Sequence, residues 1–283
     1  MHRFQTGEAM TGNDESALTR RVVLHRAAAV AGLATAASAS DVATQAEAQP
    51  AAKTFVLVHG AWHGGWCWRR VADLLQKRGH KVFTPTMTGL GERSHLLSKD
   101  ITLDTHINDI VNIFKWEDLR NVCLVAHSYA GWPCTGAIEQ IGDRVSSIVW
   151  LDAFKPDDSE EVDPASEANR KDMAALLARG VLGRRPPSAA KLFVNPKDQA
   201  WVDSKLTPQP ISAALQPVKF NGAREKVAKK LYIRAPKFPQ KSFDKAHAEC
   251  KADKSWKTLV TATGHNVMID APQWLADRLM EFA

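Results

Sequence analysis

Short apolar runs alternate with amphipathic segments along most of the chain, starting near Lys53. The runs are rich in β-branched residues, as buried strands are, and they bound stretches in which apolar residues recur at helical spacing. Two such helical stretches contain Trp68, Val71, Leu74 and Leu75, and Ile107, Ile110, Val111 and Phe114. The apolar runs predict strands at 54–59, 81–84, 121–126, 147–151, 230–234 and 257–261. This alternation predicts an α/β fold, with a mostly parallel sheet of about six strands flanked by helices.

Residues 155–220 break this rhythm. They are rich in Pro, Asp, Lys and Ala, and they contain helical pieces such as Ala168–Leu177 but no convincing strand. An insertion after the fourth strand is expected to lie over the carboxyl ends of the sheet, where open α/β folds bind ligands. We therefore predict one α/β domain of residues 51–283 that includes a helical cap at about 155–220.

Residues 1–50 have the pattern of a targeting segment. Arg20 and Arg21 precede an apolar, Ala-rich stretch from Ala27 to Ala37, and small residues follow near Ala46. The pattern resembles a twin-arginine export signal, which predicts delivery to the periplasm or beyond. The apolar stretch is too short to span a bilayer of about 30 Å, so we expect no membrane anchor in the mature form. The alternative is an Ala-rich extension that contains two arginines by chance.

Composition narrows the class of protein. Apolar residues make up 45% and charged residues 24% of the chain, which is the balance of a soluble globular protein. The net charge of +6 is spread without a run of five basic residues, so nucleic acid is not an expected partner. The four cysteines form no CxxC pair and no cluster with histidine, so a zinc site is not expected. The chemistry predicted below implies no metal or other cofactor.

The segment from Asn121 to Gly131 carries the first chemical signal. It is a strand that runs into a turn with the pattern small-x-Ser-x-small, followed by a helical stretch. This is the pattern of a nucleophile elbow, in which small neighbours leave room for the strained turn that exposes Ser128. Ala126 and Ala130 stand where glycines are usual. The alternative is a serine that merely caps the following helix.

A serine hydroxyl needs a general base, and His265 is the candidate. It follows the last predicted strand and precedes the last helix, so it should reach the same sheet edge as Ser128. The alternative is a surface loop histidine. An oxyanion formed by attack of Ser128 needs backbone donors, each contributing about 3–4 kcal/mol. The expected donors are the amides of Tyr129, directly after the serine, and Ala61, after the first strand.

With these segments in place, the chain from Lys53 onward resembles the α/β-hydrolase superfamily, within the branch of plant methylesterases and hydroxynitrile lyases. The motifs HGAWHGGW (59–66), TMTGLGER (86–93) and WVDSKLTP (201–208) carry the resemblance, which extends to bacterial esterases and carbamate hydrolases of that branch. The lyases have a threonine in the first turn and a lysine after the catalytic histidine. Here those positions are Gly60 and Asn266, so hydrolysis is favoured over cyanohydrin cleavage.

The acid of the triad departs from the common pattern. In most relatives it follows the fifth strand counted here, but residues 232–239 contain no carboxylate, and Asp244 is the first one after them. The other candidate is Asp152, directly after the fourth strand, which some members of the superfamily use. We favour Asp152, although burying it in so apolar a run is costly without a partner. A purely structural Asp152 is the remaining possibility.

These residues predict a serine hydrolase that cleaves a small, largely apolar carboxylic ester through an acyl-enzyme. Trp62 and Trp201 lie in segments that could face the pocket and are the predicted substrate contacts. The same triad could hydrolyse an amide or a carbamate. A non-catalytic ligand-binding protein on this scaffold is a further alternative, because fold alone does not establish chemistry.

Overall fold

The computed structural model describes residues 51–156 and 167–283. The predicted export signal of residues 1–50 and a part of the predicted cap therefore lie outside the described residues. Within the described ranges, no helix combines the length and the apolar character needed to cross a membrane.

Six parallel strands form the central sheet, in the order β2-β1-β3-β4-β7-β8. Their bounds are β1 (Thr54–Val58), β2 (Lys81–Phe83), β3 (Val122–His127), β4 (Val145–Leu151), β7 (Lys229–Arg234) and β8 (Trp256–Val260). Each predicted strand overlaps one of these, with ends that differ by one or two residues, so the predicted sheet is confirmed. The strand order reverses at β1, which leaves the carboxyl ends of β1 and β3 side by side at a switch point.

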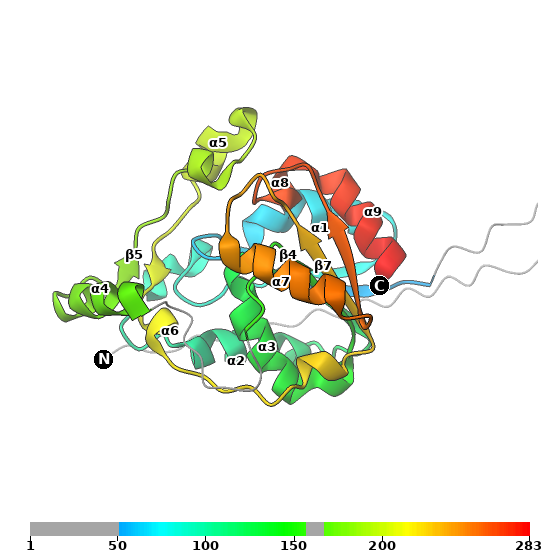
Figure 1. Cartoon of the computed structure of the whole chain (residues 1–283), viewed down its shortest axis with the longest axis horizontal. Coiled ribbons are helices and arrows are strands. Elements are labelled where there is room, and N and C mark those ends of the chain that lie inside the picture. Colours follow the sequence, from blue (N-terminus) through cyan, green and yellow to red (C-terminus); the bar gives the residue numbers. More distant parts are fainter. Residues whose placement is uncertain (1–50, 157–166) are drawn as a thin grey trace, which may run out of the picture. The chain divides into compact units, whose positions relative to one another are not determined.

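Helices cover both faces of this sheet (Figure 1). One face packs against α1 (Arg69–Lys77), α8 (Val267–Asp270) and α9 (Pro272–Phe282). The other packs against α2 (Leu103–Trp116), α3 (Gly131–Ile141) and α7 (Lys241–Ala252). Short 3₁₀ turns connect the elements: η1 (Gly65–Trp68), η2 (Gly91–Leu96), η3 (Ser128–Ala130), η4 (Gly142–Arg144), η5 (Ala189–Leu192) and η6 (Arg224–Lys226).

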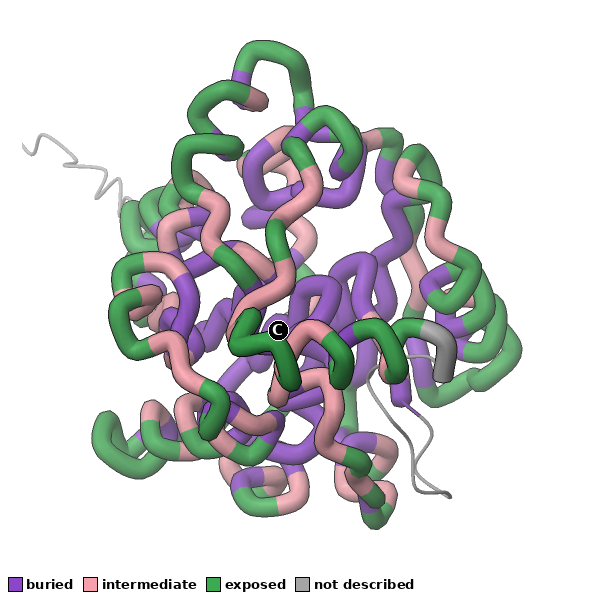
Figure 2. Tube along the Cα trace, turned by 90° about the vertical axis from the view of Figure 1, so that its left-hand side faces the viewer, coloured by how far each residue is buried: buried purple, intermediate pink, exposed green. Residues whose placement is uncertain are grey.

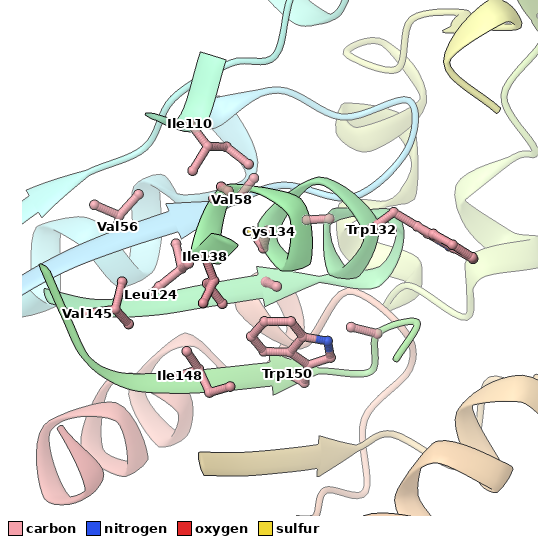
Figure 3. Close-up of a cluster of buried hydrophobic side chains, with 14 of the residues drawn as sticks. Val56, Val58, Ile110, Leu124, Trp132, Cys134, Ile138, Val145, Ile148 and Trp150 are labelled. Atoms are coloured by element: carbon pink, nitrogen blue, oxygen red, sulfur yellow. The ribbon is translucent and has the colours of Figure 1, made fainter. Parts of the chain in front are cut away.

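The alternation of side chains along each strand explains why two cores form. In β1, Val56 and Val58 belong to the core under α2 and α3, whereas Phe55 and Leu57 belong to the core under α1 and α9. Figure 3 shows the first of these cores, where Ile110 of α2 and Ile138 of α3 lie over the sheet. Buried segments occupy the interior and exposed positions gather on the outer loops and helices (Figure 2). The sheet is therefore a rigid support for the loops at its carboxyl edge.

The insertion between β4 and β7 contains α4 (Glu167–Ala178), β5 (Gly183–Arg184), α5 (Pro196–Asp203), β6 (Gln209–Pro210) and α6 (Ser212–Leu215). In Figure 1, α4, α5 and β5 lie to one side of the central sheet. One expectation for this region is wrong: β5 and β6 pair as a two-stranded antiparallel ribbon, where no strand was predicted. Strands of two residues are too short to show the period-two pattern on which strand prediction depends.

Candidate active site

Ser128 lies in a strained turn between β3 and α3. Its φ is +56°, in the left-handed region that residues with a side chain rarely adopt. Its neighbours must be small. A Cβ atom on Gly131 would lie 1.8 Å from the carbonyl oxygen of Phe154, and one on Gly60 would lie 2.8 Å from the Ser128 Cβ. Ala126 and Ala130 are fully buried, so the small residues of the predicted elbow occupy crowded positions.

His265 reaches Ser128 from the far end of the chain. Its Nε2 lies 2.9 Å from the Ser128 Oγ, and its Nδ1 lies 2.7 Å from an oxygen of Asp152. Because a carboxylate accepts hydrogen bonds, Nδ1 carries the proton and donates it, which leaves Nε2 free to accept from the serine hydroxyl. The ring stacks on Phe238, with centroids 4.3 Å apart, and its backbone N–H donates to Leu192. The imidazole therefore has one orientation and one tautomer.

Asp152 directly follows β4 and is completely buried. Arg234 Nη1 donates to its Oδ1 at 2.6 Å, and the backbone N–H of Ala235 donates to the same oxygen at 3.0 Å. The other oxygen, Oδ2, accepts from His265. The cost of burying this carboxylate is thus offset by an ion pair and by hydrogen bonds to both of its oxygens.

Arg234, which the sequence reasoning passed over, lies between the two candidate acids. Burial disfavours its charge, but Asp152 and then Asp244 outweigh that effect and raise its pKa above the usual value. Asp244 accepts from Arg234 Nε at 2.9 Å, and its side chain is 60% exposed. The structure therefore brings Asp152 to His265 and leaves Asp244 on the outer side of Arg234. An arginine at the end of a buried strand was the signal for a buried carboxylate.

The amide N–H groups of Ala61 and Tyr129 each belong to a peptide unit whose carbonyl oxygen accepts a hydrogen bond. His59 Nδ1 donates to the Gly60 carbonyl at 2.8 Å, and the Phe154 N–H donates to the Ser128 carbonyl at 3.1 Å. In a trans peptide the N–H points opposite to the carbonyl. Fixing those two carbonyls therefore fixes the directions of the Ala61 and Tyr129 N–H groups. Both residues line the cavity at Ser128.

His63 supports the loop after β1 that contains Ala61. His63 Nδ1 donates to the Ala61 carbonyl at 2.7 Å, and its Nε2 accepts from Asn266 at 2.9 Å. His59 Nε2 likewise accepts from the Met87 N–H. Burial lowers the pKa of His59 to about 3 and that of His63 to about 4, so both rings are neutral near pH 7. The sequence predicted no role for these two histidines, because nothing in their spacing indicates which carbonyls they bind.

A cavity of about 200 Å³ opens at Ser128 and His265. Both apolar and polar side chains line it, and its described apolar lining includes Trp132, Phe154, Leu192, Phe238 and Phe243. Trp62, a predicted substrate contact, also lines it. No cluster of three His, Cys, Asp or Glu side chains suited to a metal ion occurs in the part of the chain that the structure describes.

Trp201, the other predicted substrate contact, packs away from the cavity in this structure. It is not among the described residues that line the cavity. Its ring packs edge-on against Trp66, with centroids 5.2 Å apart, and the Arg70 guanidinium lies over it. An ion pair of 2.7 Å between Arg70 and Asp198 docks α5 in this position. The helix thus turns Trp201 toward α1 and not toward Ser128.

A parallel sheet with Ser, His and Asp side chains joined by hydrogen bonds at its carboxyl edge is the arrangement of the α/β-hydrolase class. The chain belongs to the alpha/beta hydrolase family, whose sequence pattern matches residues 55–278. The predicted family and fold class are confirmed.

Similar proteins within this family are named as esterases. It is 36% identical over 235 residues to a carbendazim hydrolyzing esterase of Nocardioides sp. (strain SG-4G), a match that covers 80% of this chain and 97% of the relative. It is 28% identical over 162 residues to methyl jasmonate esterase 1 of Vitis vinifera, covering 54% of this chain and 60% of the relative. These names support the prediction of a carboxylic ester hydrolase.

Solved structures share the fold. An extracellular α/β-hydrolase from a Paenibacillus species superposes with a TM-score of 0.70 at 23% identity, covering 82% of this chain and 99% of that one. Polyneuridine aldehyde esterase, solved as a mutant, superposes with a TM-score of 0.66 at 21% identity, covering 82% of this chain and 100% of that one.

Proposed function

We propose that this α/β hydrolase cleaves small, largely apolar carboxylic esters with Ser128 as nucleophile, His265 as general base and Asp152 as the triad acid. The observation that supports this most strongly is the continuous hydrogen-bond chain from the Ser128 Oγ through His265 to Asp152, with lengths of 2.9 and 2.7 Å. A serine whose hydroxyl is aligned with the free nitrogen of a neutral imidazole can lose its proton as it attacks an acyl carbon.

The reaction then follows from the surrounding groups. Ser128 attacks the ester carbonyl while His265 takes the proton, and the amides of Ala61 and Tyr129 bind the oxyanion. The alcohol leaves with the proton from His265, and water repeats the cycle on the acyl-enzyme to release the acid. Asp152 holds the tautomer and stabilises the transient imidazolium. The aromatic and aliphatic side chains that line the cavity, together with its small volume, favour a small ester with an apolar body.

Hydrolysis of a carbamate or an amide on the same triad is the second candidate. It is supported by the 36% identity to the esterase named for carbendazim, which extends over 97% of that relative. Hydroxynitrile lyase chemistry is less favoured, because Asn266 stands where the lyases have lysine and its amide is already bonded to His63.

A substrate panel on the purified protein tests the proposal. It comprises p-nitrophenyl esters of increasing chain length, an aryl carbamate and carbendazim, together with covalent labelling by a fluorophosphonate probe. We expect ester turnover and stoichiometric labelling, both abolished in Ser128→Ala and retained in Ser242→Ala, a control at an exposed serine on α7. Folded protein that is neither labelled nor active on any ester would contradict the assignment. Faster turnover of the carbamate would favour the second candidate.

We further propose export by a twin-arginine route, from the Arg20-Arg21 pair and the apolar stretch that follows. Replacing both arginines with lysine should retain the protein in the cytoplasm of a host that has this pathway. Unchanged export of that variant would contradict the proposal.

A further inference from the structure

The β5–β6 ribbon of the cap brings two polar side chains to the cavity. Arg184 of β5 is the register partner of Gln209 of β6, although 24 residues separate them along the chain. Both line the cavity together with Ser128 and His265. The ribbon thus adds a cation and a carboxamide to the polar groups of the cavity.

Arg184 is a cation that has no anionic partner in the part of the chain that the structure describes. No described carboxylate forms an ion pair with it, whereas the almost fully buried Arg224 and Arg234 each contact at least one. Its guanidinium lies 4.6 Å from the centroid of the Trp62 ring, and burial lowers its pKa. Among the described residues that line the cavity, it carries the only permanent charge. A half-buried charge of this kind is incompletely compensated until an anion binds.

Gln209 adds a donor that is also incompletely used. Its side chain is 3% exposed, and its Oε1 accepts from the Trp62 N–H at 3.1 Å. That bond determines which way the carboxamide is turned, since the amide nitrogen cannot accept. The Nε2 group is buried and has no hydrogen-bond partner among the described residues. An unpaired buried donor costs free energy that an acceptor on a bound ligand would recover.

We propose that Arg184 and Gln209 bind a carboxylate of the substrate, so that the preferred ester is the half-ester of a small dicarboxylic acid. This inference rests on the proposed function and narrows its substrate class. A planar guanidinium offers two parallel donors that match the two oxygens of a carboxylate, and the Gln209 amide N–H is a further donor at the same cavity. A neutral acceptor would satisfy Gln209 but would leave the charge of Arg184 uncompensated. The apolar walls then contact the carbon chain between the free carboxylate and the ester.

The kinetic test compares mono-p-nitrophenyl glutarate with p-nitrophenyl hexanoate, which has a similar length but no charge. For the wild type we expect kcat/KM on the half-ester to exceed that on the neutral ester, chiefly through a lower KM. Arg184→Met should reduce this ratio by about 10- to 100-fold, the range for losing hydrogen bonds to a charged group. Arg184→Lys should recover part of it, and Gln209→Met should reduce it by a few fold. Arg185→Met, at the exposed neighbour, is the matched control and should leave the ratio unchanged.

A binding measurement separates failure of this inference from failure of the proposed function. Calorimetric titration of Ser128→Ala with monomethyl glutarate requires no turnover, and binding should weaken about 10-fold or more when Arg184→Met is added. If esters are hydrolysed by Ser128 but neither the ratio nor the binding responds to Arg184→Met, the carboxylate site is wrong and Arg184 only supports the Trp62 ring. If no ester is turned over but binding depends on Arg184, the carboxylate site stands and the proposed function fails.

Discussion

The loops at the carboxyl edge of the sheet and the inner edge of the cap differ in how completely their polar side chains are paired. At the sheet edge, Ser128, His265, Asp152 and Arg234 form one continuous chain of hydrogen bonds. In the cap, Arg184 has no ion-pair partner and Gln209 an unpaired donor among the described residues. The groups of the proposed reaction are therefore already positioned without a substrate. Arg184 and Gln209, which we propose to bind the substrate, still have unused hydrogen-bonding capacity.

Residues with strained backbone conformations occur in both regions and are held by different parts of the structure. Ser128 and Asp152 both have positive φ, at +56° and +45°, and Trp62 at the meeting point of the two regions has +66°. Such conformations cost about 1–3 kcal/mol each and persist where neighbouring contacts hold them. Asp152 is held by its N–H bond to Ile233, and Trp62 is held from the cap by Thr207 and Gln209. The sheet thus holds the strained backbone of Asp152, whereas the cap holds the strained backbone of Trp62.

The largest effect should come from breaking the hydrogen-bond chain at the sheet edge. We expect Asp152→Asn to lower kcat by about 10⁴-fold, because the amide no longer favours the required tautomer of His265. Steady-state kinetics on a p-nitrophenyl ester measure this. Asp244→Asn, which alters the outer partner of Arg234, should change kcat little. The reverse pattern in these two variants would reassign the acid to Asp244.

Acid should destabilise the sheet-edge region through His63. Its pKa is about 4 in the folded protein and about 6.5 when unfolded. Between these values the unfolded chain binds a proton that the folded state does not, so stability is lost as the pH falls from 6.5 toward 4. This linkage amounts to roughly 3 kcal/mol.

Urea unfolding at pH 7 and pH 4.5 measures this loss in the wild type and in His63→Asn, which keeps a donor near the Ala61 carbonyl. The wild type should lose more stability than the variant between the two pH values. Equal losses would show that the His63 ring is not buried in its neutral form.

A smaller effect should follow from weakening the hydrogen bonds that hold the loop containing Ala61, a predicted oxyanion donor. Asn266→Ala removes the donor to His63, which in turn holds the Ala61 carbonyl. We expect kcat to fall roughly tenfold with KM nearly unchanged, the effect of one buried hydrogen bond. A double-mutant cycle with His63→Asn should be strongly non-additive, because both changes disrupt one connection. Additive losses would argue that Asn266 acts elsewhere.

The smallest effect should be at the contact between α5 and α1, away from the cavity. Trp201→Ala should leave kcat/KM within about threefold, since surface changes away from a site have small consequences. Trp62→Ala should cost clearly more, because that ring lines the cavity and contacts Arg184. Comparable losses in the two variants would mean that α5 moves Trp201 toward the substrate.

Much of the fold and part of the site could be predicted from local patterns. The six strands followed from β-branched runs, and the crowded turn at Ser128 followed from the small residues around it. His265 followed from its place after the last strand. These features depend on a few neighbouring residues and on the rule that parallel strands end at the same edge of a sheet.

The rest was decided by contacts between distant segments. Asp152 and Arg234 meet because β4 and β7 are neighbours in the sheet, and this pairing separates Asp152 from Asp244 as the partner of His265. Arg184 and Gln209 meet through strands of two residues that carry no periodic signal, and Trp201 turns away because Arg70 and Asp198 dock its helix. Local residue preferences extend over a few positions, whereas the partners of a buried charge depend on which segments pack together.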